Sequence, residues 1–219
     1  QLERPQVQGR TADFFIDIRE VTVAEYGRCV GAGHCPPPLC PQENVPDLPM
    51  ACVTQTGAVA YCAFAGKRLP TEEEWEKAAR GADARTYPWG EDAPDCSRAV
   101  YRDCAPQSAP LPAGGRLAGK SPYGTLDQAG NVWEWTATSL PIWDKETDPR
   151  RLQAGYDSTK AGEKVENKKK AGKPHFIIRG GSFLDSALSM RTTLRFLMLA
   201  DFTSRALGFR CAADPNLER

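Results

Sequence analysis

The chain has 219 residues, which is enough for one large domain with a sizeable core. Lys plus Arg and Asp plus Glu both number 28, so the formal net charge is zero and gives no reason to expect nucleic acid or an anionic membrane as a partner. No apolar run approaches the roughly 18 residues that a transmembrane helix needs, so we expect no membrane insertion.

The chain opens with a polar segment, residues 1–12, that we expect to be loose, followed by a short strand over residues 13–18. Thr22 with Glu25 three residues later is a capping box, which predicts a helix from Thr22 to about residue 33. Residues 35–49 hold six of the 18 prolines, so we expect a loop there.

Two more helices are predicted before residue 82. The first opens at Thr54 or Thr56 and stops at Gly66, because glycine suits the turn that ends a helix. The second covers residues 71–81, opens with another capping box and has the clearest helical signals in the chain.

Beyond residue 81, Gly, Pro, Asp and Ser interrupt the sequence every few residues. Short strands are predicted at residues 98–101, 131–136, 175–179 and 207–212. The lysines of residues 157–174 could form a nucleic-acid patch, but zero net charge favours a solvated flexible loop. Such a loop-rich chain usually carries function or is held by disulfides or metals.

Eight cysteines are present, and an even number at this density predicts disulfides in an oxidising, extracytoplasmic compartment. Zinc is the alternative, but the closest spacing is Cys35-x4-Cys40, and His34 and His175 are the only histidines. The start at residues 1–4 is typical of a mature chain, so we expect an export signal to have been removed.

Five motifs together resemble the formylglycine-generating enzyme, or sulfatase-modifying factor, family. They are residues 65–76, 87–90, 130–135, 179–183 and 207–212. The resemblance covers about residues 13–213, which predicts one domain over that range with residues 214–219 as a tail. It implies an α+β fold of the C-type-lectin-like kind with little regular secondary structure, as the loop-rich sequence also indicates.

The resemblance implies catalytic chemistry that this chain lacks. The family's enzymes bind copper through two cysteines, about six and eleven residues beyond the arginine of the Arg-Gly-Gly-Ser motif. Here no cysteine lies between Cys104 and Cys211, and Met190 alone makes a poor copper site. The iron-dependent branch of the fold needs three histidines, and the chain has two. Copper is therefore not expected, and the chain is predicted to be a pseudoenzyme.

Calcium is the one cofactor that the resemblance favours. Asp127 and Glu134 match the family's side-chain ligands, and Gly130 and Val132 match its backbone carbonyl ligands. Such oxygen ligands suit Ca²⁺. The alternative is that Glu134 pairs with an arginine, and Arg210 is expected to be a buried ion-pair or stacking partner. The family's second calcium site is expected to be lost, because Ala99 replaces a ligand.

The resemblance also implies a disulfide between Cys62 and Cys211. Cys96 and Cys104 are neighbours in one loop and are expected to pair. The remaining cysteines allow three connectivities, of which Cys29–Cys35 with Cys40–Cys52 is favoured.

We therefore expect a non-catalytic domain that recognises another protein or a small ligand, as related receptor modules and appendages of bacterial kinases do. The candidate surface is Leu184, Asp185, Leu188, Arg191, Leu194, Leu197 and Leu199. Full burial of Leu184 and Leu199 would contradict it. The alternative is an enzyme with different chemistry, whose cleft is lined by Ser182, Asp185, Ser186, Arg191 and Arg195.

Overall fold

The computed structural model describes residues 9–41, 45–105, 108–140 and 174–215. The helices are α1 (Val23–Gly31), α2 (Gln55–Phe64) and α3 (Glu72–Arg80), with short 3-10 turns at Leu117–Gly119 and Ala187–Met190. The strands are β1 (Phe15–Ile16), β2 (Trp133–Leu140), β3 (His175–Arg179), β4 (Arg195–Leu199), β5 (Leu207–Gly208) and β6 (Ala212–Ala213). None of the helices in these ranges is long and apolar enough to cross a membrane.

The predicted helix starts are confirmed. α1 begins after Thr22, whose side chain accepts a hydrogen bond from the Glu25 N–H while Glu25 bonds the Thr22 N–H. α3 begins with the same reciprocal pair of bonds between Thr71 and Glu74. Each box satisfies two N–H groups that the first helical turn would otherwise leave without partners.

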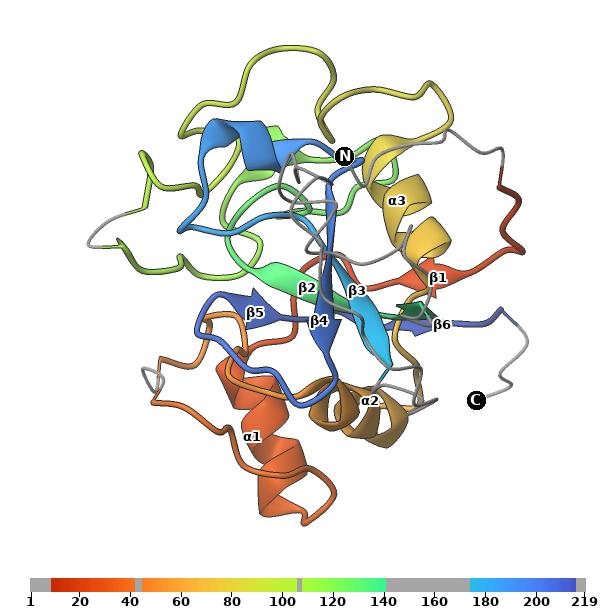
Figure 1. Ribbon diagram of the computed structural model, residues 1–219, viewed down its shortest axis with the longest axis vertical. Coiled ribbons are helices and arrows are strands. Elements are labelled where there is room, and N and C mark those ends of the chain that lie inside the picture. Colours follow the sequence, from red (N-terminus) through yellow and green to blue (C-terminus); the bar gives the residue numbers. More distant parts are fainter. Residues whose placement is uncertain (1–8, 42–44, 106–107, 141–173, 216–219) are drawn as a thin grey trace, which may run out of the picture.

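A four-stranded sheet in the order β4-β3-β2-β5 lies at the centre of the molecule (Figure 1). β3 pairs antiparallel with β2 and β4, whereas β5 pairs parallel with β2. A second sheet pairs β1 with β6, so the two ends of the described chain meet.

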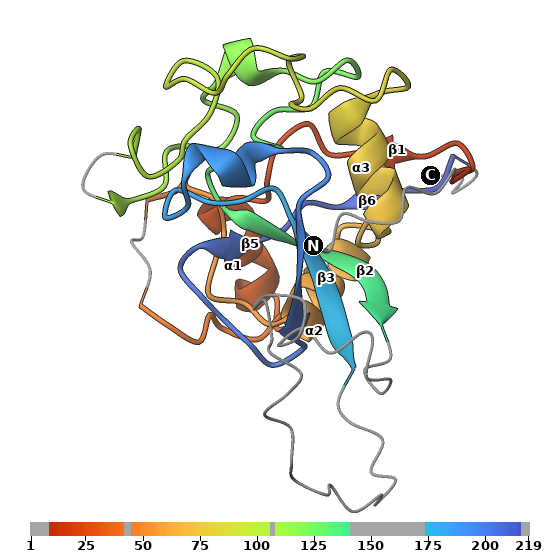
Figure 2. The same cartoon turned by 45° about the horizontal axis from the view of Figure 1, so that its top comes forward.

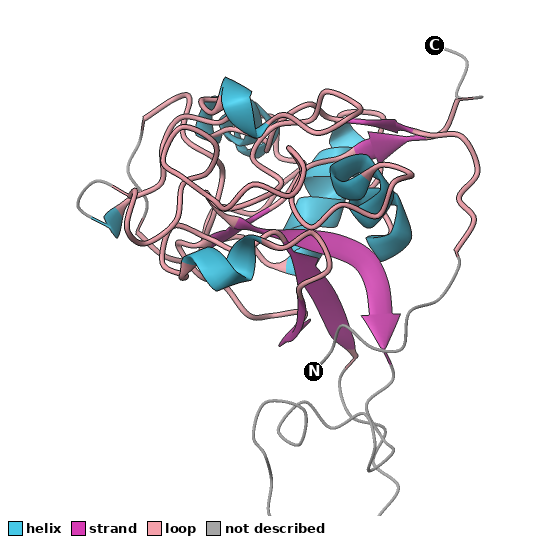
Figure 3. Ribbon diagram, turned by 90° about the horizontal axis from the view of Figure 1, so that it is seen from above, coloured by secondary structure: helices cyan, strands magenta, loops and turns pink. Residues whose placement is uncertain are grey.

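Helices and loops cover different ends of the central sheet. α1 and α2 lie together at one end, α3 contacts β2 and β3, and the loops that follow α3 form a layer at the other end (Figures 1 and 2). Loops make up most of the described chain (Figure 3), as the sequence predicts. The main core joins Tyr26, Phe209 and Trp135 beneath the sheet. Burying one tryptophan side chain is worth about 4–6 kcal/mol as an upper estimate.

The strand predictions need correction in four places. Residues 98–101 form no strand, because Val100 makes only an isolated bridge to Gly130. Residues 207–212 form two short strands, β5 and β6, in different sheets. β4 was missed, because its sequence was interpreted as a binding segment. The predicted strand at residues 13–18 is reduced to β1, and residues 157–173 of the predicted lysine-rich loop lie outside the described residues.

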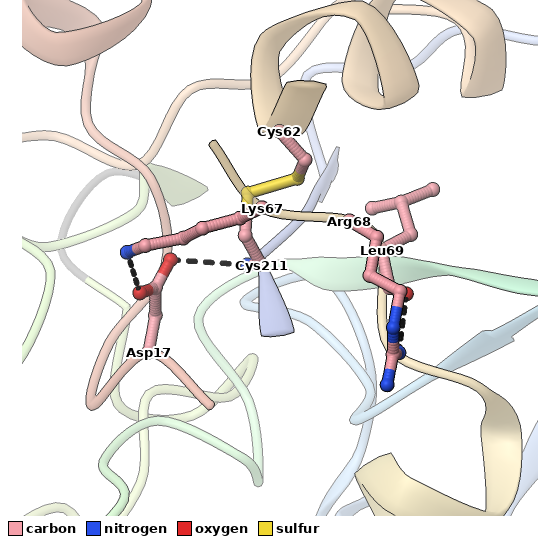
Figure 4. Close-up of a disulfide and its surroundings, with 6 residues drawn as sticks. All are labelled: Asp17, Cys62, Lys67, Arg68, Leu69 and Cys211. Atoms are coloured by element: carbon pink, nitrogen blue, oxygen red, sulfur yellow. Dashed lines mark hydrogen bonds and ion pairs between the residues drawn. A yellow bond between two sulfur atoms is a disulfide. The ribbon is translucent and has the colours of Figure 1, made fainter. Parts of the chain in front are cut away.

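All eight cysteines are paired, in the combinations that the sequence favoured: Cys29–Cys35, Cys40–Cys52, Cys62–Cys211 and Cys96–Cys104. The bond between Cys62 and Cys211 spans 149 residues and ties α2 to the end of the chain (Figure 4). Asp17 reinforces this junction, because its carboxylate accepts from the Cys211 N–H at 3.1 Å and pairs with Lys67. These four disulfides agree with an oxidising, extracytoplasmic environment.

Candidate functional site

Asp185 lies at the position where the resemblance implies the first copper-binding cysteine. Its Oδ2 atom accepts hydrogen bonds from the Ser182 N–H at 3.0 Å, the Ser182 hydroxyl at 2.5 Å and the Trp133 indole N–H at 2.9 Å. Among the described residues, no donor reaches Oδ1 and no Lys or Arg forms an ion pair with this carboxylate. Within the described ranges, the carboxylate is thus held through Oδ2, and its Oδ1 atom can accept a hydrogen bond from a ligand.

A pocket of about 290 Å³ opens beside Asp185. Its walls come from β2, β3, β4, β5 and the loops after β3 and β4. Three residues supply its polar groups, namely Ser182, Asp185 and Ser204. The apolar walls are Trp133, Ile178, Leu184, Phe196, Met198, Phe202, Ala206 and Leu207. A small, mostly apolar cavity with a few polar groups is typical of a ligand site. A wider hollow beside His34 and Phe64 has no carboxylate among its lining residues.

Met190, which lies where the second copper-binding cysteine is implied, is completely buried. It packs in a small cluster with Ala99, Tyr101 and Ala129. The thioether therefore serves packing, as the sequence analysis favoured, and does not line the pocket.

The predicted binding surface is partly exposed. Leu184 and Leu199 each expose 37% of their surface and Leu188 exposes 72%, so the condition that would have contradicted this surface is not met. Leu194, Leu197 and Arg191 are half-buried. The pocket brings together Leu184 and Asp185 from this set, whereas Leu188 lies outside its lining.

The cleft predicted for an altered enzyme is not assembled. Only Ser182 and Asp185 of its five residues line the pocket. Arg195 instead pairs with Glu72 at 3.0 Å, and Arg191 donates to the Leu188 carbonyl at 2.7 Å. Within the described residues, no group of three or more His, Cys, Asp or Glu side chains could hold a metal ion.

A fully buried ion pair includes Glu134 of β2, the residue that follows the pocket-lining Trp133. Arg210 bonds both carboxylate oxygens of Glu134 at 2.7 Å, and Glu134 also accepts from the Trp75 indole N–H at 2.7 Å. Burial alone would lower the pKa of Arg210, but the Glu134 carboxylate outweighs it and raises this pKa. Glu134 therefore pairs with Arg210, which is the alternative to a calcium role that the sequence offers.

Two further carboxyl groups adjoin this ion pair. Glu20 is completely buried, and Asp127 is 3% exposed and accepts from the Gly114 N–H. Burial, with the charges of Asp127 and Glu134 added to it, raises the pKa of Glu20 well above its ordinary value. Sequence analysis missed Glu20, because a glutamate in the loop between a short strand and a helix carries no signal of burial.

Calcium at residues 127–134 stays a prediction. Gly130 is required there whatever the ligand, because its φ is +91° and a Cβ atom would lie 2.4 Å from the Val100 carbonyl oxygen. Three of the four proposed ligands, Asp127, Gly130 and Val132, lie in the loop that runs into β2, and Glu134 is the second residue of that strand. Glu134, however, already uses both oxygens, so Asp127 is the better placed of the two carboxylates.

Comparison with known proteins agrees with the resemblance. The family described as "Sulfatase-modifying factor enzyme 1-like domain" matches residues 1–215. A formylglycine-generating enzyme of Thermomonospora curvata is 33% identical over 193 residues, covering 78% of this chain and 57% of the relative. The inactive C-alpha-formylglycine-generating enzyme 2 of Mus musculus is also 33% identical, over 183 residues, covering 77% and 50%.

A hercynine oxygenase of Mycolicibacterium thermoresistibile is 36% identical over 157 residues, covering 68% of this chain and 32% of the relative. The chain thus spans at most 57% of the length of these three relatives. Among solved structures, PvdO from Pseudomonas aeruginosa superposes with a TM-score of 0.64 at 22% identity, covering 91% of this chain and 79% of that one. CarF gives 0.66 at 18% identity, covering 91% and 86%. These likenesses confirm the expected α+β, C-type-lectin-like fold.

Proposed function

This chain belongs to the sulfatase-modifying factor enzyme 1-like domain family, and we propose that it is a non-catalytic recognition domain. The supporting observation is that the pocket has apolar walls and contains Asp185, which stands at the position where the resemblance implies the first of the two cysteines. No thiol is free in the chain, because all eight cysteines are in disulfides.

The pocket chemistry suggests a ligand with an apolar body and an ammonium group. The Oδ1 atom of Asp185 has no donor among the described residues, so a ligand ammonium can bond it without displacing Trp133 or Ser182. A volume of about 290 Å³ is at the small end of ligand pockets, which favours one ring or a short branched chain. The same group could be presented by a small molecule or by a lysine side chain of a partner.

The test is binding of 2-phenylethylammonium to the chain with its disulfides intact, followed by tryptophan fluorescence, because Trp133 lines the pocket. We expect the neutral alcohol 2-phenylethanol and the anion phenylacetate to bind at least tenfold more weakly, because charge-assisted hydrogen bonds are worth about 1.5–3 kcal/mol. Asp185→Asn keeps an oxygen acceptor for Ser182 and removes the charge, so it should weaken amine binding by about tenfold or more.

The matched control is Asp83→Asn, an exposed carboxylate that pairs with Arg85 away from the pocket lining. It should leave the amine affinity unchanged. Equal binding of the amine, the alcohol and the acid would contradict recognition through Asp185. A lysine-containing peptide in competition with the free amine separates the two sources of the ammonium group.

A second candidate is an enzyme with altered chemistry, which the likeness to hercynine oxygenases favours. Its minimum requirement is a bound transition metal. Metal analysis of the purified chain tests it, and stoichiometric iron or copper would replace the recognition proposal. Bound calcium would not replace the recognition proposal, since calcium is compatible with a non-catalytic role.

A further inference from the structure

Arg102 is an exposed residue that holds the backbone of the pocket loop in place. Its N–H donates to the Asp185 carbonyl at 2.8 Å, and its Nε atom donates to the Leu184 carbonyl at 3.0 Å. Leu184 lines the pocket and exposes 37% of its surface, so it marks the rim. The guanidinium of Arg102 is therefore held at the rim, next to the residue that we propose to bind an ammonium group.

Arg205 approaches the same rim from the segment between β4 and β5. Its neighbours in the chain, Ser204 and Ala206, both line the pocket. Its guanidinium carbon lies 5.5 Å from the centre of the Phe183 ring, and Phe183 directly precedes Leu184. The face of an aromatic ring attracts a cation, which favours this placement of the exposed side chain.

Neither guanidinium has an anionic partner in the part of the chain that the structure describes. Arg102 and Arg205 form no ion pair there, whereas Arg98 and Arg195 each pair with a carboxylate. Asp103, which follows Arg102 in the chain, is exposed and pairs with neither arginine within the same ranges. Two exposed cations at one small pocket attract a partner of opposite charge.

The pocket and its rim therefore favour opposite charges. Asp185 offers a carboxylate oxygen to an ammonium group, whereas the two arginines attract anions. A lysine side chain suits the pocket, because its methylene stem can pack on apolar walls while its ammonium group meets a carboxylate. A volume of about 290 Å³ holds one such side chain and leaves the rest of the partner outside, against the rim.

Resting on the proposed function, we propose that the partner is a protein segment in which a lysine is flanked by acidic residues. The lysine enters the pocket and bonds Asp185, and the flanking carboxylates pair with Arg102 and Arg205. Two cations held by different segments suit a chain with several carboxylates better than a small molecule with one.

The experiment measures the affinity of three peptides, blocked at both ends, for the chain with its disulfides intact. The first has a lysine between two pairs of glutamates, the second has glutamines in place of the glutamates, and the third has norleucine in place of the lysine. The first should bind about tenfold more tightly than the second, and this preference should shrink at high salt, because salt screens exposed ion pairs. The third should bind at least tenfold more weakly than the first.

Arg102→Met and Arg205→Met each remove one charge from the rim. Each should reduce the preference for glutamates over glutamines about threefold, and the double variant should abolish it. Arg28→Met is the matched control, because Arg28 is exposed on α1 and does not line the pocket. It removes the same charge and should keep the preference. Because the result is a ratio of two affinities, a general weakening of the pocket cannot imitate it.

Two outcomes would overturn the inference. One is equal affinity for the glutamate and glutamine peptides, and the other is a norleucine peptide that binds as tightly as the lysine peptide. If 2-phenylethylammonium still bound through Asp185, either result would leave the proposed function standing. A parent chain that bound neither this amine nor the lysine peptides would overturn the proposed function together with the inference.

Discussion

β2 has two faces with different roles, and their comparison explains how this domain is built. Successive residues of a strand point to opposite faces. Trp133 lines the pocket and donates a hydrogen bond to Asp185. The next residue, Glu134, accepts hydrogen bonds from Arg210 and Trp75, and we call these three buried residues the frame. On the pocket side, Asp185 stands where the resemblance implies a cysteine. One face can therefore change its chemistry while the other maintains the fold.

Removal of a disulfide is the change for which we expect the largest loss of stability, and the loss should differ between the long-range bond Cys62–Cys211 and the local bond Cys96–Cys104. Replacing Cys62 and Cys211 by serine should lower the free energy of unfolding by about 5 kcal/mol, because the bond closes a loop of 149 residues. Replacing Cys96 and Cys104 should cost about 2.5 kcal/mol, because their separation is 8. Urea unfolding of both variants measures the difference, and equal losses would contradict a loop-entropy origin.

Arg210→Met tests the frame directly. Removing one partner of a buried ion pair leaves Glu134 charged and unpaired, so we expect a loss of about 3–5 kcal/mol. Arg98→Met is the control, since Arg98 pairs with the largely exposed Asp92 and should cost at most about 1 kcal/mol. Urea unfolding at neutral pH compares them. If the two losses were similar, Arg210 would not be a main support of the frame.

Glu74→Gln has a smaller effect that depends on pH. Burial alone would raise the pKa of Glu74, but its bonds to Arg68 and the Thr71 N–H outweigh burial and lower it. A lowered pKa in the folded state adds stability above the unfolded value of about 4.3 and loses it as the pH falls through the folded pKa. The variant should therefore cost about 1 kcal/mol at pH 7, and the difference should vanish in acid unfolding experiments near pH 2. A difference that grows towards low pH would contradict this sign.

Leu188→Ser should have the smallest effect on stability. Leu188 is 72% exposed and lies outside the pocket lining, so we expect a change within about 0.5 kcal/mol and unchanged amine binding. Leu184→Ser is the comparison, because Leu184 lines the pocket and should weaken amine binding severalfold. Titration with 2-phenylethylammonium measures both, and a larger effect at Leu188 would extend the recognition surface beyond the pocket.

Local signals predicted much of the frame. Capping boxes at Thr22 and Thr71 fixed two helix starts, because the bonds that make them join residues three apart. β3 has the predicted bounds, residues 175–179. Strand prediction failed at residues 98–101 and in β4, where pairing with distant segments decides what a short apolar run becomes.

The sequence by itself determined the family and the absence of cysteines between Cys104 and Cys211, because these depend on which residues are present and in what order. The pairing of Cys62 with Cys211 was implied by the family resemblance, and the structure confirmed it. The tertiary structure alone decided that Asp185 lies beside an apolar pocket with no donor to its Oδ1 atom among the described residues, and that Glu20 is completely buried. The physical reason is that burial and hydrogen bonding are set by segments far apart in the chain. Glu20 and Asn131, which form one such hydrogen bond, are 111 residues apart.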